Sequence, residues 1–106
     1  MYIVTIKFTR PTTDIEFYTL KQSTEIPPEL KKYFASTYVF SGKLITTDWT
    51  YSDDNLSATV MTIWATKADF DEYTTDARLV AEFFPNRTAY NTEHGITMEK
   101  ISAEEI

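Results

Sequence analysis

The first residues of the chain alternate between apolar and polar positions. The apolar set on one face of residues 2–9 is Tyr2, Val4, Ile6 and Phe8. Alternation with a period of two is typical of a strand that is buried on one side. Pro11 lacks the amide hydrogen that a sheet requires, so we predict that this strand ends just before it.

Two further stretches predict a β-hairpin. Residues 43–51 alternate, which puts Ile45 and Trp49 on one face and Leu44 on the other. Residues 56–65 are apolar on both faces, as expected for a central strand. Between them, residues 52–55 read Ser-Asp-Asp-Asn, whose side chains commonly bond the backbone of a turn.

A helix is predicted from Pro28, because proline is well tolerated in a first turn. Leu30, Phe34 and Tyr38 recur every four residues and form one apolar stripe. Gly42 follows at the position where helices often end in a left-handed residue.

A second helical region is expected to end at His94, with two interruptions. Thr66 is a good N-cap residue, Asp76 indicates a break with a new cap, and Pro85 predicts a kink or a restart. Gly95 is expected to stop the last turn. A closing strand is predicted over residues 96–101.

The connection over residues 12–26 has two interpretations. Thr13 and Glu16 have the spacing of a capping box, which favours a short helix carrying Phe17 and Leu20. Residues 17–20 fit an extended conformation equally well. Because such a long connection is unusual in a compact domain, a flap over a pocket is one explanation for it.

The predicted element order is βαββαβ, which indicates an α+β, ferredoxin-like domain over residues 1–106. Its four-stranded antiparallel sheet has strand order 4-1-3-2, and right-handed crossovers put the helices on one face. The other face is predicted to be largely apolar, with Ile3, Thr5, Trp49, Met61 and Ile63. Burying ~600 Å² of such surface at ~25 cal/mol per Å² gives roughly 15 kcal/mol before the costs of association. We therefore predict a symmetric homodimer that pairs its sheets.

Amino-acid composition and charge argue against several classes of site and partner. The 106 residues include 16 acidic and 10 basic side chains, one histidine and no cysteine, for a net charge of −6. The lack of cysteine excludes disulfides and thiolate metal sites, and a single histidine argues against zinc or iron. The acidic balance argues against nucleic-acid binding. The first residues lack the basic start and long apolar run of a signal peptide, and no stretch approaches ~18 apolar residues, so we expect a soluble cytoplasmic protein without a cofactor.

Residues between positions 64 and 96 carry a resemblance to a known family. The matching positions are Trp64-Ala65-Thr66, Phe70, Tyr73, Phe83, Arg87, Tyr90-Asn91 and Gly95-Ile96. They resemble the second half of the dimeric α+β barrel superfamily, whose members include antibiotic-biosynthesis-monooxygenase-like proteins. The chain also looks like small uncharacterised ferredoxin-like proteins from environmental sequences. Because these are mostly packing and capping positions, they bear on the fold more than on an activity.

The resemblance implies a pocket between the helices and the sheet that can hold an aromatic molecule. The candidate ligand-binding residues are Trp64, Tyr73, Arg87, Tyr90, Asn91 and His94. In cofactor-independent monooxygenases of the superfamily, Trp, Asn, Tyr and Arg side chains position a phenolic substrate. Haem-degrading members use an Asn on the first strand and a His about ten residues after the Trp. Here the first strand has no Asn and that later position is Thr74, which argues against haem degradation.

Each candidate also has a structural interpretation. His94 is either a general base or a helix-terminal residue favoured by the helix dipole. Arg87 either binds an anionic substrate or pairs with Glu82 or Asn91 on the surface. Trp64 either lines a pocket or belongs to the core.

Three classes of function remain. The first is a dimer that binds a small aromatic or apolar molecule without catalysis. The second is a cofactor-independent oxygenase or isomerase acting on a phenolic compound, and the third is an interaction module without a ligand. A closed apolar pocket with convergent polar groups favours the first two, whereas an interior filled by side chains leaves the third.

Overall fold

The computed structural model describes residues 1–20 and 23–106. At its centre is one four-stranded sheet in the order β2-β3-β1-β4, whose neighbouring strands are antiparallel. The strands are β1 (Tyr2–Thr9), β2 (Leu44–Tyr51), β3 (Ser57–Trp64) and β4 (Thr97–Glu105). This topology confirms the predicted 4-1-3-2 sheet.

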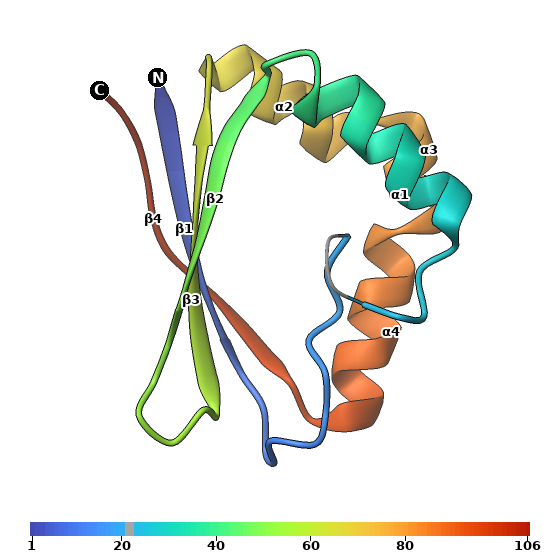
Figure 1. Ribbon diagram of the computed structural model, residues 1–106, viewed down its shortest axis with the longest axis vertical. Helices are drawn as coiled ribbons and strands as arrows, with labels where there is room; N and C mark the ends of the chain where they lie inside the picture. Colours follow the sequence, from blue (N-terminus) through green and yellow to red (C-terminus); the bar gives the residue numbers. More distant parts are fainter. Residues whose placement is uncertain (21–22) are drawn as a thin grey trace.

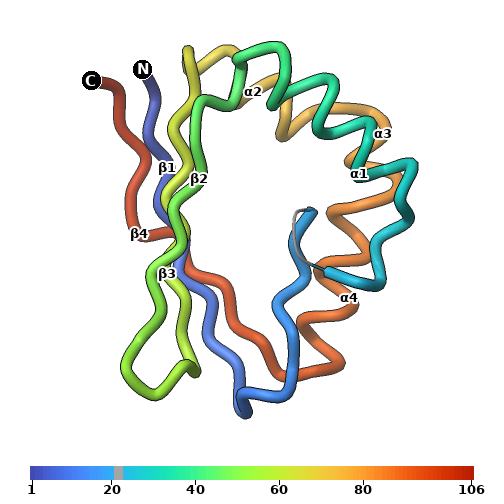
Figure 2. The backbone as a smooth tube through the Cα atoms, viewed as in Figure 1, coloured from blue at the N-terminus to red at the C-terminus, as the bar shows by residue number. Residues whose placement is uncertain are grey.

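The helices all lie on one face of the sheet, as Figure 1 and Figure 2 show. They are α1 (Pro28–Phe34), the π-helical turn η1 (Ala35–Val39), α2 (Lys67–Thr75), α3 (Ala77–Glu82) and α4 (Phe84–His94). The ferredoxin-like α+β fold is thereby confirmed. Within the described residues, no helix is both long enough and apolar enough to cross a membrane.

The predicted boundaries of the second helical region are confirmed. The Thr66 hydroxyl accepts the backbone N–H of Asp69 at 3.1 Å and caps α2. The Asp76 carboxylate accepts two N–H groups in the first turn of α3. Pro85 lies in the first turn of α4, where the helix restarts, and Gly95 ends α4 with a φ of +71°.

The first helical run ends in a wider turn than an α-helix has. The N–H of Phe40 donates to the carbonyl of Ala35 at 2.8 Å, which is the five-residue spacing of a π-helix. The extra residue in this turn keeps Tyr38 on the inner side of the run together with Leu30, and both side chains are buried. Gly42 follows with a φ of +83°, the left-handed conformation predicted there.

The predicted outward position of Trp49 is wrong. The pairing of β2 with β3 shifts by one residue between Leu44 and Thr46, so Ile45 is an extra residue and forms a β-bulge. A bulge exchanges the faces to which the following residues point. Trp49 therefore faces the helices, where its ring stacks on that of Phe8 at 6.2 Å.

The closing strand is longer than predicted. β4 pairs with β1 along its whole length, from Thr97 opposite Thr9 to Glu105 opposite Tyr2, with Ile101 as an extra residue. The prediction ended at residue 101 because the following residues are mostly polar. β4 is an edge strand and is largely exposed, so an apolar pattern is not required of it.

The connection after β1 contains no helix over residues 12–20, so the capping-box interpretation is wrong. The Glu16 carboxylate instead accepts hydrogen bonds from the Ser23 hydroxyl at 3.1 Å and from the Thr24 backbone at 2.8 Å. Figure 2 shows this segment running inside the molecule, between the sheet and α4. The connection is thus part of the core and does not cover a pocket from outside; residues 21 and 22 of the predicted flap lie outside the described residues.

The core lies between the sheet and the helices, and aromatic rings make up much of it. The segment before α1 supplies Phe17, Tyr18, Leu20 and Ile26, all buried. They pack beside residues from the strands and helices: Tyr2, Val4, Phe8, Leu30, Tyr38, Trp64, Leu79 and Phe83.

Candidate functional site

The candidate ligand-binding residues occupy two regions of the helical face. Trp64 at the end of β3 and Tyr73 on α2 lie toward Arg87, near the start of α4. Tyr90 and His94 lie at the other end of α4. The candidate side chains therefore do not form a single cluster.

Trp64 is a core residue, with 2% of its surface exposed. Its indole N–H donates to the hydroxyl of Thr62 on the same strand at 2.9 Å. Its ring lies 5.0 Å from that of Tyr73 and makes an edge contact with Tyr38 at 6.2 Å. The ring faces and the donor that could orient a ligand are thus engaged by the chain itself.

Arg87 interacts with aromatic rings and does not pair with Glu82. Its guanidinium group lies 5.3 Å from the centre of the Phe83 ring and 5.2 Å from that of Phe84. Burial raises the pKa of the Tyr73 phenol, and the nearby Arg87 offsets part of this effect. Glu82 instead pairs with Arg78 at 2.9 Å, one turn earlier.

Tyr90 fastens α4 to the connection after β1. Its hydroxyl donates to the backbone carbonyl of Glu16 at 2.7 Å, and its ring lies 4.2 Å from that of His94. Burial raises the pKa of this phenol, and nearby carboxylates, including Glu16, add to the effect. Tyr90 and His94 line an open hollow of about 510 Å³ together with Asp14, Ile15, Glu16, Thr24 and Glu25.

Asn91 contributes its backbone to the end of α4. Its carbonyl oxygen accepts the N–H of Gly95 and, at 2.9 Å, the N–H of Ile96. His94 belongs to the same last turn, where the negative end of the helix dipole favours a cationic side chain. Both positions thus have a structural part in terminating the helix.

Asp76 lies between the phenol groups of two tyrosines. The sequence predicted only its capping role and not these contacts. Asp76 accepts hydrogen bonds from the hydroxyls of Tyr33, at 2.6 Å, and Tyr38, while also capping α3. Burial disfavours the charged form of the Asp76 carboxylate and by itself would raise its pKa. The hydrogen bonds outweigh this effect and hold the pKa below its ordinary value. The hydrogen bond to Asp76 raises the pKa of Tyr33, and burial together with the same bond raises that of Tyr38.

The π-helical turn explains why two tyrosines reach one carboxylate. Tyr33 and Tyr38 are five residues apart, and in a regular α-helix such residues diverge by about 140°. The wider turn at residues 35–39 reduces this divergence. Composition and apolar spacing carry no signal for a π-turn, so the sequence did not reveal the cluster.

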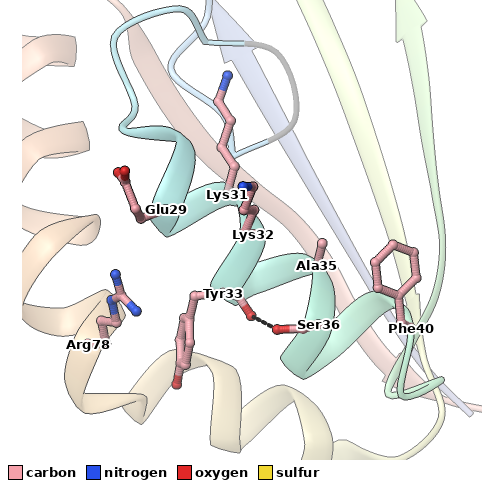
Figure 3. Close-up of a pocket in the computed structure, with 8 residues that line it drawn as sticks. All are labelled: Glu29, Lys31, Lys32, Tyr33, Ala35, Ser36, Phe40 and Arg78. Atoms are coloured by element: carbon pink, nitrogen blue, oxygen red, sulfur yellow. Dashed lines mark hydrogen bonds between the residues drawn. The ribbon is translucent and has the colours of Figure 1, made fainter.

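A second open hollow, of about 620 Å³, lies between the α1–η1 run and α3, as shown in Figure 3. Its walls are formed by Glu29, Lys31, Lys32, Tyr33, Ala35, Ser36, Phe40 and Arg78. None of these residues was among the sequence-based candidates. A signal that could have found them is the adjacent pair Lys31 and Lys32, two basic residues in a chain of net charge −6.

The fold and its connections define a class of protein: a ferredoxin-like α+β domain with its helices on one face. The chain is similar to a candidate antibiotic biosynthesis monooxygenase from Deinococcus radiodurans, with a TM-score of 0.50 and 9% identity over 100% of this chain and 92% of that one. It is also similar to Rv0793 from Mycobacterium tuberculosis, with a TM-score of 0.43 and 9% identity over 100% and 95% of the two chains. No model of a known protein family matches the chain, and no curated protein matches its sequence.

The first of these likenesses supports the ferredoxin-like fold of the chain. At 9% identity it bears on the fold alone. One fold hosts many activities, so function has to be argued from the residues of this chain.

Proposed function

We propose that this protein is an assembly domain that forms a homodimer through the uncovered face of its sheet. The supporting observation is a row of apolar side chains on that face. Ile3 on β1 pairs with Ile63 on β3, and Met61 lies two residues further along β3, opposite Thr5. The helices are on the opposite side of the sheet (Figure 1), so they leave these half-buried side chains uncovered, and a second molecule could bury them fully.

The filled interior supports assembly over ligand binding between the helices and the sheet. In that space Tyr18 stacks on Phe83 at 5.6 Å and contacts Tyr90 at 5.2 Å. The described chain thus supplies its own aromatic ring where the resemblance implied an aromatic ligand. An interior filled by side chains favours an interaction module over a ligand-binding domain.

The inward position of Trp49 lowers the affinity that we expect. The apolar contribution now rests on Ile3, Met61 and Ile63. The other positions of this face are polar: Thr5, Thr9, Thr46, Thr50 and Thr59, together with the charged residues Lys7 opposite Thr59, Asp48 opposite Met61 and Glu104 opposite Ile3. Burying an apolar side chain fully contributes about 1.5–3 kcal/mol, while association costs about 4–15 kcal/mol. We therefore expect a dimer that is weaker than one with Trp49 at the interface and that dissociates on dilution.

Sedimentation velocity over a concentration series tests the proposal. The wild-type protein should move from the 12.3 kDa monomer to a dimer of twice that mass. Ile63→Glu should remain monomeric, because its charge would be buried without a partner in the dimer. Val80→Glu, at a 47% exposed apolar position on α3, is the matched control and should dimerise normally. A wild-type monomer at 100 μM, or a dimer of unchanged strength in Ile63→Glu, would refute the assembly.

Small-molecule binding is a second candidate, favoured by the open hollow that holds Tyr90 and His94. Two aromatic rings face carboxylates from the connection after β1 there, a combination that suits an organic cation. Native mass spectrometry of freshly purified protein should then reveal a retained ligand. The ligand should be lost in His94→Ala and kept in Thr92→Ala, an exposed position on the same helix. A spectrum with unliganded protein alone would count against this candidate.

A further inference from the structure

The hollow between the α1–η1 run and α3 differs in charge from the rest of the molecule. The chain carries a net charge of −6, yet Lys31, Lys32 and Arg78 border this hollow and Glu29 is its one acidic lining residue. Three of the chain's ten basic residues thus gather at one site. A local positive field on an acidic protein selects for a negatively charged partner.

Two of these cations are available to a partner. Arg78 already pairs with Glu82 at 2.9 Å, and its guanidinium group lies 4.9 Å from the centre of the Tyr33 ring. Lys31 and Lys32, by contrast, take part in no ion pair within the described residues, although the charge of Lys31 acts on the Glu16 carboxylate. A carboxylate that approaches the hollow therefore meets two lysines that no ion pair holds, and it competes with Glu16 for Lys31.

The same hollow has an apolar end formed by Phe40. This side chain is 83% exposed, the most exposed of the large apolar residues in the described chain. It directly follows the π-helical turn, and such turns occur frequently at functional sites. Figure 3 shows Phe40 at one end of the hollow, with Tyr33 and Arg78 toward the other end. The basic side chains and Tyr33 thus lie toward one end of the open groove, and Phe40 lies at the other end.

We propose that this groove binds an acidic peptide segment of another protein. An apolar side chain of the peptide rests on Phe40 and Tyr33, and flanking carboxylates face Lys31 and Lys32. The openness of the groove fits a peptide, which lies along a surface, better than a small molecule, which needs enclosure on most sides. The groove is in the helical layer, so it stays accessible when two sheets pair through their opposite faces (Figure 1).

Fluorescence anisotropy with two synthetic peptides tests this proposal. The probe is a fluorescein-labelled peptide in which glutamates flank two phenylalanines, and its counterpart carries lysines in place of the glutamates. The acidic probe should bind saturably, more weakly at high salt because exposed charges are screened. The lysine peptide should not bind.

Two variants, Lys32→Glu and Phe40→Ser, should each weaken binding of the acidic probe by about tenfold or more. The controls are Lys100→Glu, which is the same charge reversal, and Ile101→Ser, which also changes a large exposed apolar residue to serine; both lie at exposed positions of β4. Circular dichroism establishes that every variant is folded. The proposal is overturned by absent binding, by equal binding of both peptides, or by equal losses in the controls. Binding that persists in the Ile63→Glu monomer separates this groove from the dimer surface.

Discussion

At the residue scale, Asp76 connects three parts of the helical layer. One carboxylate oxygen caps α3, and the other accepts the hydroxyls of Tyr33 and Tyr38 from the first helical run. The cap was predictable because its signal is local, as it was for Thr66 and Gly95. The two phenol bonds were not, because they join residues about 40 positions apart in the chain and depend on a π-turn.

Asp76→Ala is therefore expected to destabilise the protein more than the loss of a cap alone. Removing an N-cap costs about 1 kcal/mol. Leaving two partly buried hydroxyls without their acceptor adds about 1–3 kcal/mol. Thr66→Ala, which removes the cap of α2, is the matched control. Urea unfolding followed by circular dichroism measures both free energies, and equal losses in the two variants would contradict the role of the tyrosines.

The same carboxylate predicts a dependence of stability on pH. Because its pKa is lower in the folded protein, the Asp76 contribution is fully present above its unfolded pKa of about 4. It is lost as the pH falls through the folded value. Asp76→Asn keeps a capping oxygen but carries no charge, so its unfolding free energy should fall less than that of the wild type between pH 5 and the acid limit. Parallel curves for the two proteins would exclude this linkage.

At the element scale, prediction succeeded where the pattern was local and uninterrupted. β1 has the predicted bounds because its alternation is unbroken from Tyr2 to Thr9. On β2, one extra residue at Ile45 exchanged the two faces, which no count of alternating residues can detect. The conformation of the connection after β1 could not be predicted from the spacing of Thr13 and Glu16. Glu16 accepts hydrogen bonds from Ser23 and Thr24, seven and eight residues later, and a capping-box pattern does not include such bonds.

Substitutions at Trp49 test the corrected face. Trp49→Ala removes a ring that packs on Phe8 and Phe17, and should cost about 3 kcal/mol. Trp49→Phe should stay close to the wild type, because the buried indole N–H has no hydrogen-bond partner within the described residues. Chemical denaturation gives both values, and sedimentation should find each folded variant as dimeric as the wild type. A selective loss of the dimer in Trp49→Ala would instead place this ring at the interface.

At the scale of the whole molecule, the order of elements was sufficient to predict the sheet topology and the single helical face. The candidate site was harder, because a resemblance in the fold carries no information on what fills the interior. Trp64 and Arg87 were expected beside a ligand, but they contact Tyr73, Phe83 and Phe84 of the chain itself. The monooxygenase alternative would thus require these contacts to open. Oxygen uptake with a panel of phenols tests it directly, and turnover that Arg87→Ala leaves unchanged would remove that residue from the assignment.

If Tyr18 occupies the space that a phenolic ligand would take, removing its ring should create a binding site. Tyr18→Ala should lower the unfolding free energy by about 3 kcal/mol and leave an apolar cavity large enough for a small aromatic molecule. A tenfold excess of phenol over its dissociation constant then restores about 1.4 kcal/mol, or about 6 °C in melting temperature. The wild type and Tyr51→Ala, which truncates an exposed tyrosine on β2, should not respond. A thermal-shift series with all three proteins decides the matter, since an equal response of the wild type would mean that the interior already has room for a ligand.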